Sequence, residues 1–271
     1  MCRFWKVSRQ AFYKDRVDLK VRQQEQVLLL AKVKNIRKEH VKLGTLKLRY
    51  ELRKELNQCG RGLGRDKFFD LLRANDLLIT RRRRYAVTTN SKHAFYKHTN
   101  QLTGARITGP DQAWVSDITY LSTRNKFVYL SLVTDVFSRK IVGWNVDSSL
   151  AVEGALEAIN MALKGCLDPR HLIHHSDRGI QYCCNAYNTL AKAKGIKMSM
   201  GEAGNCYDNA IAERVNGILK SEYLLDHEFL NIEEAVKAVK QGIYLYNHKR
   251  PHWSLNLQKP AEVYKQKARK N

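Results

Sequence analysis

The sequence predicts an α/β protein built on a mixed sheet and preceded by an all-helical region. Segments rich in β-branched and aromatic residues begin after Pro110 and then alternate with amphipathic helices. Before that point, hydrophobic residues recur at helical spacing and are interrupted by glycines. Positive charge is also concentrated in the first part of the chain. We therefore expect two regions with different tasks.

The first region, residues 1–85, is expected to be helical. Apolar residues at helical spacing predict a helix from Val21 to His40. Two further apolar stripes flank a glycine-rich break: Leu48, Leu52 and Leu56 before it, Gly60, Gly62 and Gly64 within it, and Phe68, Phe69 and Leu72 after it. A helix, a break and a basic helix together outline a helix-turn-helix unit, which predicts DNA binding. A small helical pair without such a role is the alternative.

The distribution of charge indicates a polyanion as partner. Residues 1–100 contain 26 Lys and Arg but 9 Asp and Glu, a net charge of +17, whereas residues 113–223 have a net charge of only +1. Basic blocks of this size are typical of proteins that bind nucleic acid. Four consecutive arginines follow the predicted helix-turn-helix and are expected to contact DNA phosphates: Arg81, Arg82, Arg83 and Arg84.

Residues 110–225 are expected to contain the sheet, after a linker over residues 86–109 that is rich in Thr, Ser, Asn and His. Three strand-like runs come first, and the short breaks between them suit antiparallel hairpins: AWVSDITYL, KFVYLSLVTDVFS and KIVGWNV. Helices and strands then alternate: LAVEGALEAINMALKG, HLIHHSD, NAYNTLAKAKG, IKMSM and YDNAIAERVNGILK. The order βββαβαβα is the outline of a ribonuclease-H-like fold. Residues 226–271 are expected to form a C-terminal helical extension with a basic tail.

The last helix of this core has an apolar face and a polar face. Ile211, Val215 and Ile218 fall on one side and are predicted to face the core, with Asp208 as the N-cap. The opposite face is predicted to point away from the core and carries Asn209, Glu213, Asn216 and Lys220.

Three acidic residues lie where such a sheet gathers functional groups. Asp117 is in the first predicted strand, Asp177 is at the end of the fourth, and Glu213 is on the last helix. Converging carboxylates repel one another, and divalent cations relieve that repulsion. Oxygen ligands suit Mg²⁺ or Mn²⁺, and a pair of such ions clamps the attacking and leaving oxygens of a phosphoryl transfer. We therefore expect these acids to be catalytic residues and ligands of two metal ions.

From Asp117 through Glu213 the chain resembles the DDE transposases of bacterial insertion sequences and the retroviral integrases. The resemblance is strongest to the second-reading-frame product of the insertion-sequence-three family and extends over residues 20–265. The stretches that carry it are WVSDITYL, YLSLVTDVFSRKIVGW, HHSDRGIQY, YDNAIAERVNGILKSE and YNHKRPHWSLN. The 35 residues between Asp177 and Glu213 also match the interval of this family.

The resemblance implies an enzyme that cleaves DNA at the ends of an insertion element and joins the freed 3′-OH to target DNA. It implies that Asp117 is shared between two metal ions, that Asp177 and Glu213 each bind one, and that Lys220 contacts the DNA end. It also implies a homo-oligomer on DNA and a first-reading-frame product as a further partner. The alternatives are a nuclease of the same fold that only hydrolyses DNA, and an inactive DNA-binding remnant.

Other candidate residues have weaker signals. Asp135 ends the second predicted strand and is expected to have a structural or indirect role. Two histidines and two cysteines lie near one another but have no usual zinc-binding spacing: His174, His175, Cys183 and Cys184. In YNHKRPHW, Arg250 is predicted to contact DNA, and packing of Tyr246 and Trp253 against the core is the alternative for this segment.

The location of the protein is expected to be the bacterial cytoplasm, in association with the nucleoid. The six cysteines include no CxxC pair, which suits free thiols in a reducing compartment. The start, MCRFWKVSRQ, lacks the apolar run of a signal peptide, and no segment has the length of a membrane span.

Overall fold

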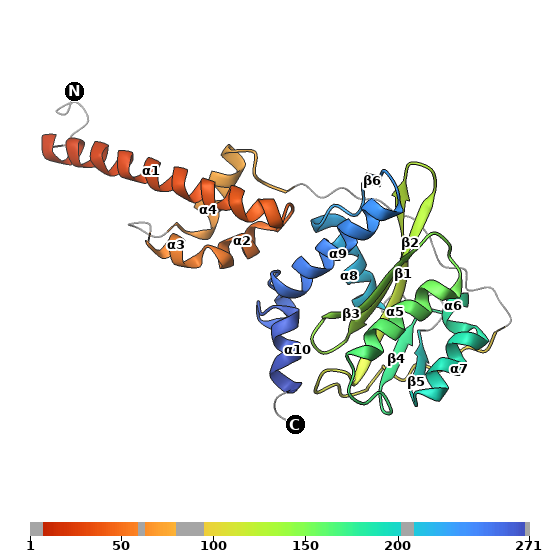
Figure 1. Cartoon of the computed structure of the whole chain (residues 1–271). Coiled ribbons are helices and arrows are strands. Elements are labelled where there is room, and N and C mark those ends of the chain that lie inside the picture. The colour runs from red at the N-terminus through yellow and green to blue at the C-terminus, as the bar shows by residue number, and fades with distance from the viewer. Residues whose placement is uncertain (1–7, 59–62, 80–94, 202–208, 269–271) are drawn as a thin grey trace. The chain divides into compact units, whose positions relative to one another are not determined.

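The computed structural model describes residues 8–58, 63–79, 95–201 and 209–268. The chain divides into two compact units, residues 1–83 and residues 84–271 (Figure 1). Each unit has a hydrophobic core of its own.

The N-terminal unit consists of helices, as the sequence predicts. They are α1 (Arg9–Glu39), α2 (Thr45–Glu51), α3 (Arg53–Gln58) and α4 (Arg65–Ala74). The buried core joins the second half of α1 to both predicted apolar stripes: Leu29, Val33, Leu43, Leu48, Leu52, Leu56, Phe68 and Leu72. The first helix begins at Arg9 and not at Val21, and the stripe of Leu48, Leu52 and Leu56 is divided between α2 and α3 at Leu52.

The second unit confirms the predicted order βββαβαβα and adds short elements to it. Its strands are β1 (Ala113–Thr123), β2 (Phe127–Asp135), β3 (Ile141–Asp147), β4 (Ile173–Ser176), β5 (Lys197–Met200) and β6 (Glu228–Phe229). Its helices are α5 (Val152–Lys164), α6 (Ile180–Cys183), α7 (Asn185–Ala193), α8 (Ala210–Glu222), α9 (Ile232–His248), a 3-10 turn at Trp253–Leu255 and α10 (Pro260–Ala268). The sequence did not predict β6 or α6.

The sheet is mixed and has the strand order β3-β2-β1-β4-β5, with β6 also paired to β1. The first three strands form an antiparallel meander, and β4 and β5 run parallel to β1. A ribonuclease-H-like fold has this arrangement: an antiparallel meander comes first, and helices then connect it to strands that run parallel to β1.

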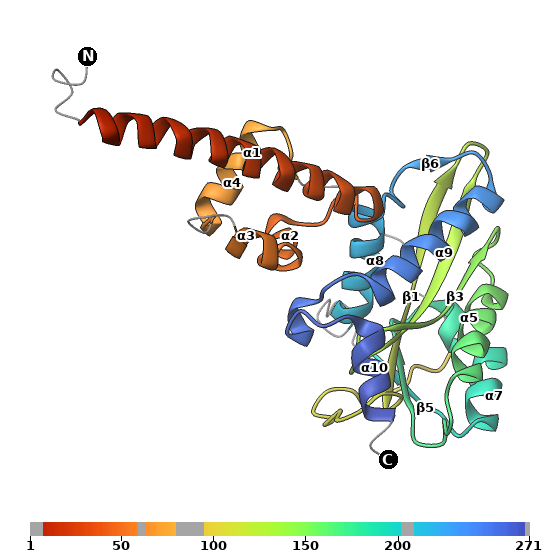
Figure 2. The ribbon, with the colours of Figure 1, turned by 60° about the vertical axis from the view of Figure 1, so that its left-hand side comes forward.

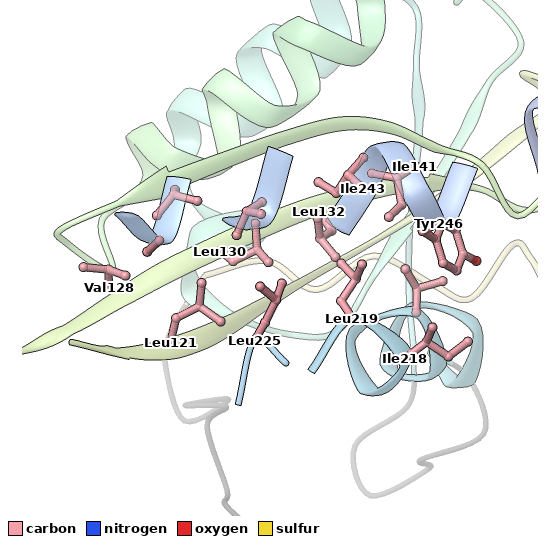
Figure 3. Close-up of a cluster of buried hydrophobic side chains, with 14 of the residues drawn as sticks. Leu121, Val128, Leu130, Leu132, Ile141, Ile218, Leu219, Leu225, Ile243 and Tyr246 are labelled. Atoms are coloured by element: carbon pink, nitrogen blue, oxygen red, sulfur yellow. The ribbon is translucent and has the colours of Figure 1, made fainter. Parts of the chain in front are cut away.

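Helices cover both faces of the sheet (Figures 1 and 2). Leu130 and Leu132 of β2 pack with α8 and α9, whereas Val133 faces the other way and packs with α5 and α7. Figure 3 shows the first of these cores, in which strand side chains point toward Ile218, Leu219 and other apolar residues of the helices. The predicted apolar face of the last helix is therefore confirmed for Val215 and Ile218, which are buried here.

The segments before and after the predicted core are bound to the sheet. Residues 95–109, expected to be a linker, contact β5 through a hydrogen bond from Gln101 N to Ser199 Oγ of 2.8 Å. On the C-terminal side, the side-chain amide of Asn247 forms two hydrogen bonds with the first residue of β3. It accepts from Ile141 N and donates to Ile141 O, both at 3.0 Å. The core of this unit thus extends beyond residues 110–225. Among the described helices, none combines the length and the apolar character that a membrane crossing requires.

Candidate active site

Asp117 lies on β1 directly after the residues that pair with β4. β4 pairs with β1 only along Ala113–Ser116, and β6 pairs only with Ser122 and Thr123. Among the described residues, the stretch of β1 between these pairings has one unpaired edge. Asp117 projects from the same face as Leu121, which packs against α8. Its half-buried carboxylate therefore faces α8 beside an open edge of the sheet.

Beyond the end of β4, two asparagines of the α8 region form hydrogen bonds with β1. Asn209 Nδ2 donates to Ser116 O at 3.2 Å, and Asn216 Nδ2 donates to Asp117 Oδ2 at 2.7 Å. Asn209 and Asn216 are 6% and 5% exposed, so the prediction that the whole polar face points away from the core is wrong for these two residues. Asn216 is also a site residue that the sequence analysis missed, although it lies one turn beyond Glu213 on the face already singled out.

Neighbouring acids act on Asp117. The pKa of Asp117 is raised to about 7, because burial and the negative charges of Asp177 and Glu213 together outweigh the hydrogen bonds from Asn216 and Ile118 N, which lower it. The fold thus brings Asp177, at the end of β4, and Glu213, on α8, within electrostatic range of Asp117 on β1. A site with this much uncompensated negative charge favours a cation.

Asp177 follows β4 directly and is half-buried. Its Oδ1 accepts a hydrogen bond from Gly179 N at 3.0 Å, which fixes the carboxylate against the backbone turn. A Cβ at Gly179 would lie 3.0 Å from the same oxygen. The glycine therefore leaves room for the carboxylate to approach the backbone.

Glu213 and Lys220 both lie on α8, two turns apart. The Glu213 side chain is exposed, and the Lys220 side chain is half-buried with Nζ 4.3 Å from the ring centroid of Tyr120. Burial lowers the pKa of Lys220, and the charges of Asp117 and Asp226 oppose this effect. The predicted DNA-binding lysine therefore lies within electrostatic range of Asp117.

The three carboxylates provide the oxygen donors that a divalent cation prefers, and a bound cation would relieve the repulsion between them. They do not lie close enough together to coordinate one ion. Within the described part of the chain, no three side chains of His, Cys, Asp or Glu lie close enough together to hold a metal ion. One carboxylate on β1, one directly after β4 and an exposed helical glutamate suit Mg²⁺ or Mn²⁺ better than zinc, which prefers nitrogen and sulfur.

The histidines considered for zinc have other bonds. His174 Nε2 lies 2.7 Å from Ser116 Oγ and 3.1 Å from the hydroxyl of Tyr187. Burial and the nearby His175 lower the pKa of His174 to about 3, so the imidazole is neutral. These contacts join β4 to α7 and to Ser116 of β1, the residue before Asp117.

Asp135 and Arg250 both have structural partners. Asp135 is fully buried and accepts hydrogen bonds from Ser138 N at 2.7 Å and from Asp111 N at 2.9 Å, which agrees with the expected structural role. Arg250 is 2% exposed and forms two hydrogen bonds with Glu222, of 2.7 and 2.8 Å. The prediction that Arg250 contacts DNA is wrong in this structure, because its guanidinium is buried and already paired with a carboxylate. Tyr246 is also buried, so this part of the segment packs against the core.

The remaining predicted contacts lie outside the described residues. These are Arg81, Arg82, Arg83 and Arg84, together with the predicted N-cap Asp208. The described N-cap of α8 is Asn209, whose side chain makes no capping hydrogen bond.

The sequence and the fold of this chain match known proteins. Two family models described as "Integrase core domain" match residues 107–206 and residues 194–260. An uncharacterized 31 kDa protein of insertion element IS600 from Shigella sonnei is 36% identical over 99% of this chain and 100% of its own length. The transposase of insertion sequence element IS629 from Shigella sonnei is 40% identical over 58% of this chain and 52% of that protein.

A transposase of insertion sequence IS3A from Escherichia coli K12 is 39% identical over 46% of this chain and 43% of that protein. The chain thus matches about half the length of these two named transposases. A simian T-cell lymphotropic virus intasome contains a chain with the same fold, at a TM-score of 0.51 and 17% identity, covering 82% of this chain and 70% of that one. The resemblance to the DDE transposases is confirmed, and the chain belongs to the transposases of bacterial insertion elements, which are DDE-type enzymes built on an integrase core domain.

Proposed function

We propose that this chain cleaves DNA at the ends of its insertion element and then joins the freed 3′-OH to target DNA. The observation that carries the proposal is the electrostatic coupling of Asp117 to Asp177 and Glu213 at the open edge of β1. Phosphoryl transfer of this kind needs in-line placement of the reacting oxygens and neutralisation of developing charge, and it needs no covalent enzyme intermediate.

Asp117, Asp177 and Glu213 would hold Mg²⁺ or Mn²⁺, most simply two ions with Asp117 shared between them. The bound ions would supply charge compensation at the attacking and leaving oxygens. Asn216 orients the Asp117 carboxylate through the 2.7 Å hydrogen bond to Oδ2. The backbone of Gly179 does the same for Asp177.

DNA would be bound by several parts of the chain. Lys220, near Asp117, would contact a phosphate of the element end. The basic N-terminal region would supply most of the affinity as a helix-turn-helix unit, together with the arginines that follow it: Arg81, Arg82, Arg83 and Arg84. The relatives named as transposases support DNA as the partner. A homo-oligomer on DNA and a first-reading-frame product complete the proposed assembly.

The test is a strand-transfer assay with the full chain and a duplex that ends in the terminal sequence of its element. Asp117→Asn, Asp177→Asn and Glu213→Gln should each nearly abolish cleavage and joining and leave DNA binding intact. Activity should depend on Mg²⁺ or Mn²⁺ and should be lost on chelation. A variant that retains activity within about tenfold of the parent would remove that residue from the site.

Asp147→Asn is a matched control, because Asp147 is a half-buried carboxylate at the end of β3. It should retain both activities. Cleavage without any joined product would favour the nuclease alternative. Binding of element ends without cleavage, at any concentration of either metal, would favour an inactive remnant.

A further inference from the structure

The lysine assigned to the DNA end rests on an aromatic ring. Lys220 Nζ lies 4.3 Å from the centroid of the Tyr120 ring, and both side chains are half-buried. Asp117 and Asp226 attract this ammonium from a distance. Among the described residues, however, no carboxylate forms an ion pair with it, so the ring is its direct contact.

The Tyr120 ring is supported by its own neighbours. It packs edge-on against Phe127, with the ring centroids 5.1 Å apart. In the sheet, Tyr120 is paired with Tyr129 of β2. The backbone of Tyr120 belongs to the part of β1 between the β4 and β6 pairings, three residues beyond Asp117. Phe127 therefore supports the ring, and the backbone that carries the ring borders the open edge of β1.

An aromatic partner has a property that a carboxylate partner lacks. The face of the ring attracts an ammonium through its quadrupole but carries no net charge. A carboxylate would neutralise the lysine and compete with a DNA phosphate for it. A lysine held on a ring keeps its full charge available, and its flexible side chain loses less freedom when the phosphate binds.

We propose that Tyr120 is a positioning residue that holds Lys220 at the open edge of β1, charged and ready to receive a phosphate of the element end. This inference rests on the proposed role of Lys220 at the DNA end. It adds a residue on a different element, to which sequence pattern alone assigned no role.

The experiment measures binding of the full chain to a labelled duplex that ends in the terminal sequence of its element, over a range of salt concentrations. Five variants are compared: Tyr120→Leu, Tyr120→Phe, Lys220→Ala, the double variant Tyr120→Leu with Lys220→Ala, and Tyr129→Leu. Tyr129→Leu is the matched control, because it removes the half-buried tyrosine paired with Tyr120 on the next strand. The Tm of each variant is measured to detect general damage to the sheet.

Lys220→Ala should weaken end binding and reduce the salt dependence by about one counterion. Tyr120→Leu should weaken end binding about fivefold, as expected for loss of a partly desolvated cation–π contact. Tyr120→Phe, which keeps the ring face, should restore binding to within about twofold of the parent. In the Lys220→Ala background, Tyr120→Leu should have no further effect, because the ring acts through the lysine.

The outcomes separate this inference from the proposed function. If Lys220→Ala weakens binding but Tyr120→Leu behaves like Tyr129→Leu, the positioning role is wrong and the DNA contact stands. If Tyr120→Leu is equally damaging with and without Lys220, the ring acts on the DNA directly and the inference is overturned. If Lys220→Ala has no effect, the contact between Lys220 and the DNA end is refuted, and the role of Tyr120 with it.

Discussion

The amide of Asn216 fixes the direction of the Asp117 carboxylate through a 2.7 Å hydrogen bond. The same bond lowers the pKa of Asp117, against burial and the neighbouring acids. Asn216→Ala should therefore lower cleavage and joining by about 10- to 100-fold, the loss typical when a residue supporting a metal ligand is removed. Single-turnover cleavage measures this effect. DNA binding should be unchanged, because Asn216 is 5% exposed.

Asn209→Ala is the matched control for this prediction. Asn209 has the same amide, is similarly buried and also bonds to β1, but its acceptor is the backbone of Ser116. It should cost stability and affect the chemistry less. Equal losses of activity in the two variants would mean that the position of α8 matters and that the bond to Asp117 does not.

The surroundings of a residue were predictable where its type and the element that carries it were enough to indicate them. The elements that carry Asp117 and Asp177 were predictable because strands and their ends are recognisable from composition, and the helix that carries Glu213 because a helix face can be drawn from spacing. The surroundings of Asn216 and Arg250 were not, because the partner of each lies far along the chain: Asn216 binds Asp117, and Arg250 binds Glu222. Without these partners, a polar residue on a helix or in a basic segment reads as exposed.

At the scale of elements, α5 packs unusually close to β3. A Cβ at Gly143 would lie 2.1 Å from the backbone oxygen of Ala158 and 2.9 Å from the Cβ of Ala162. Gly143→Ala should therefore push α5 away from the sheet and lower the free energy of unfolding by about 3 kcal/mol, the upper part of the range for overpacking. Urea denaturation with a fixed spectroscopic probe measures the change.

The control for this prediction is another glycine in the same unit. Gly217 lies within α8 and has open space around the position of a Cβ. Gly217→Ala should stabilise the unit by about 0.5–1 kcal/mol, because alanine has the better helix propensity. Similar destabilisation by both substitutions would contradict the assignment of close packing to Gly143.

The long elements of the second unit were predictable, whereas two of its short ones, β6 and α6, were not. The three strands of the meander and the helices α5, α7 and α8 have enough residues for their periodicity to appear in the sequence. β6 has two residues and α6 has four, so neither is long enough for a hydrophobic pattern to repeat. Each exists because of its surroundings: β6, for example, pairs with Ser122 and Thr123 at the far end of β1.

At the scale of the whole molecule, the distribution of charge predicts that DNA affinity and catalysis reside in different parts of the chain. Residues 1–100 have a net charge of +17, and residues 113–223 have a net charge of +1. Removal of residues 1–85 should weaken binding to element ends at least about 100-fold and flatten its dependence on salt. The remaining chain retains its two sheet cores and should keep a cooperative thermal transition. If it binds the ends as tightly as the whole chain, the N-terminal assignment is wrong.

Side-chain hydrogen bonds fasten the chain after β6 to earlier parts of its unit: Asn247 binds Ile141, Arg250 binds Glu222, and Tyr264 binds Asp111. A stop codon anywhere upstream of the codon for Tyr264 would remove at least one of these attachments and leave buried polar groups without partners. Gene copies truncated near their 3′ end should therefore yield unstable products that cellular proteases remove, even though the codons for Asp117, Asp177 and Glu213 are intact. A survey that separates working copies of the element from decayed ones must read each gene through these last codons.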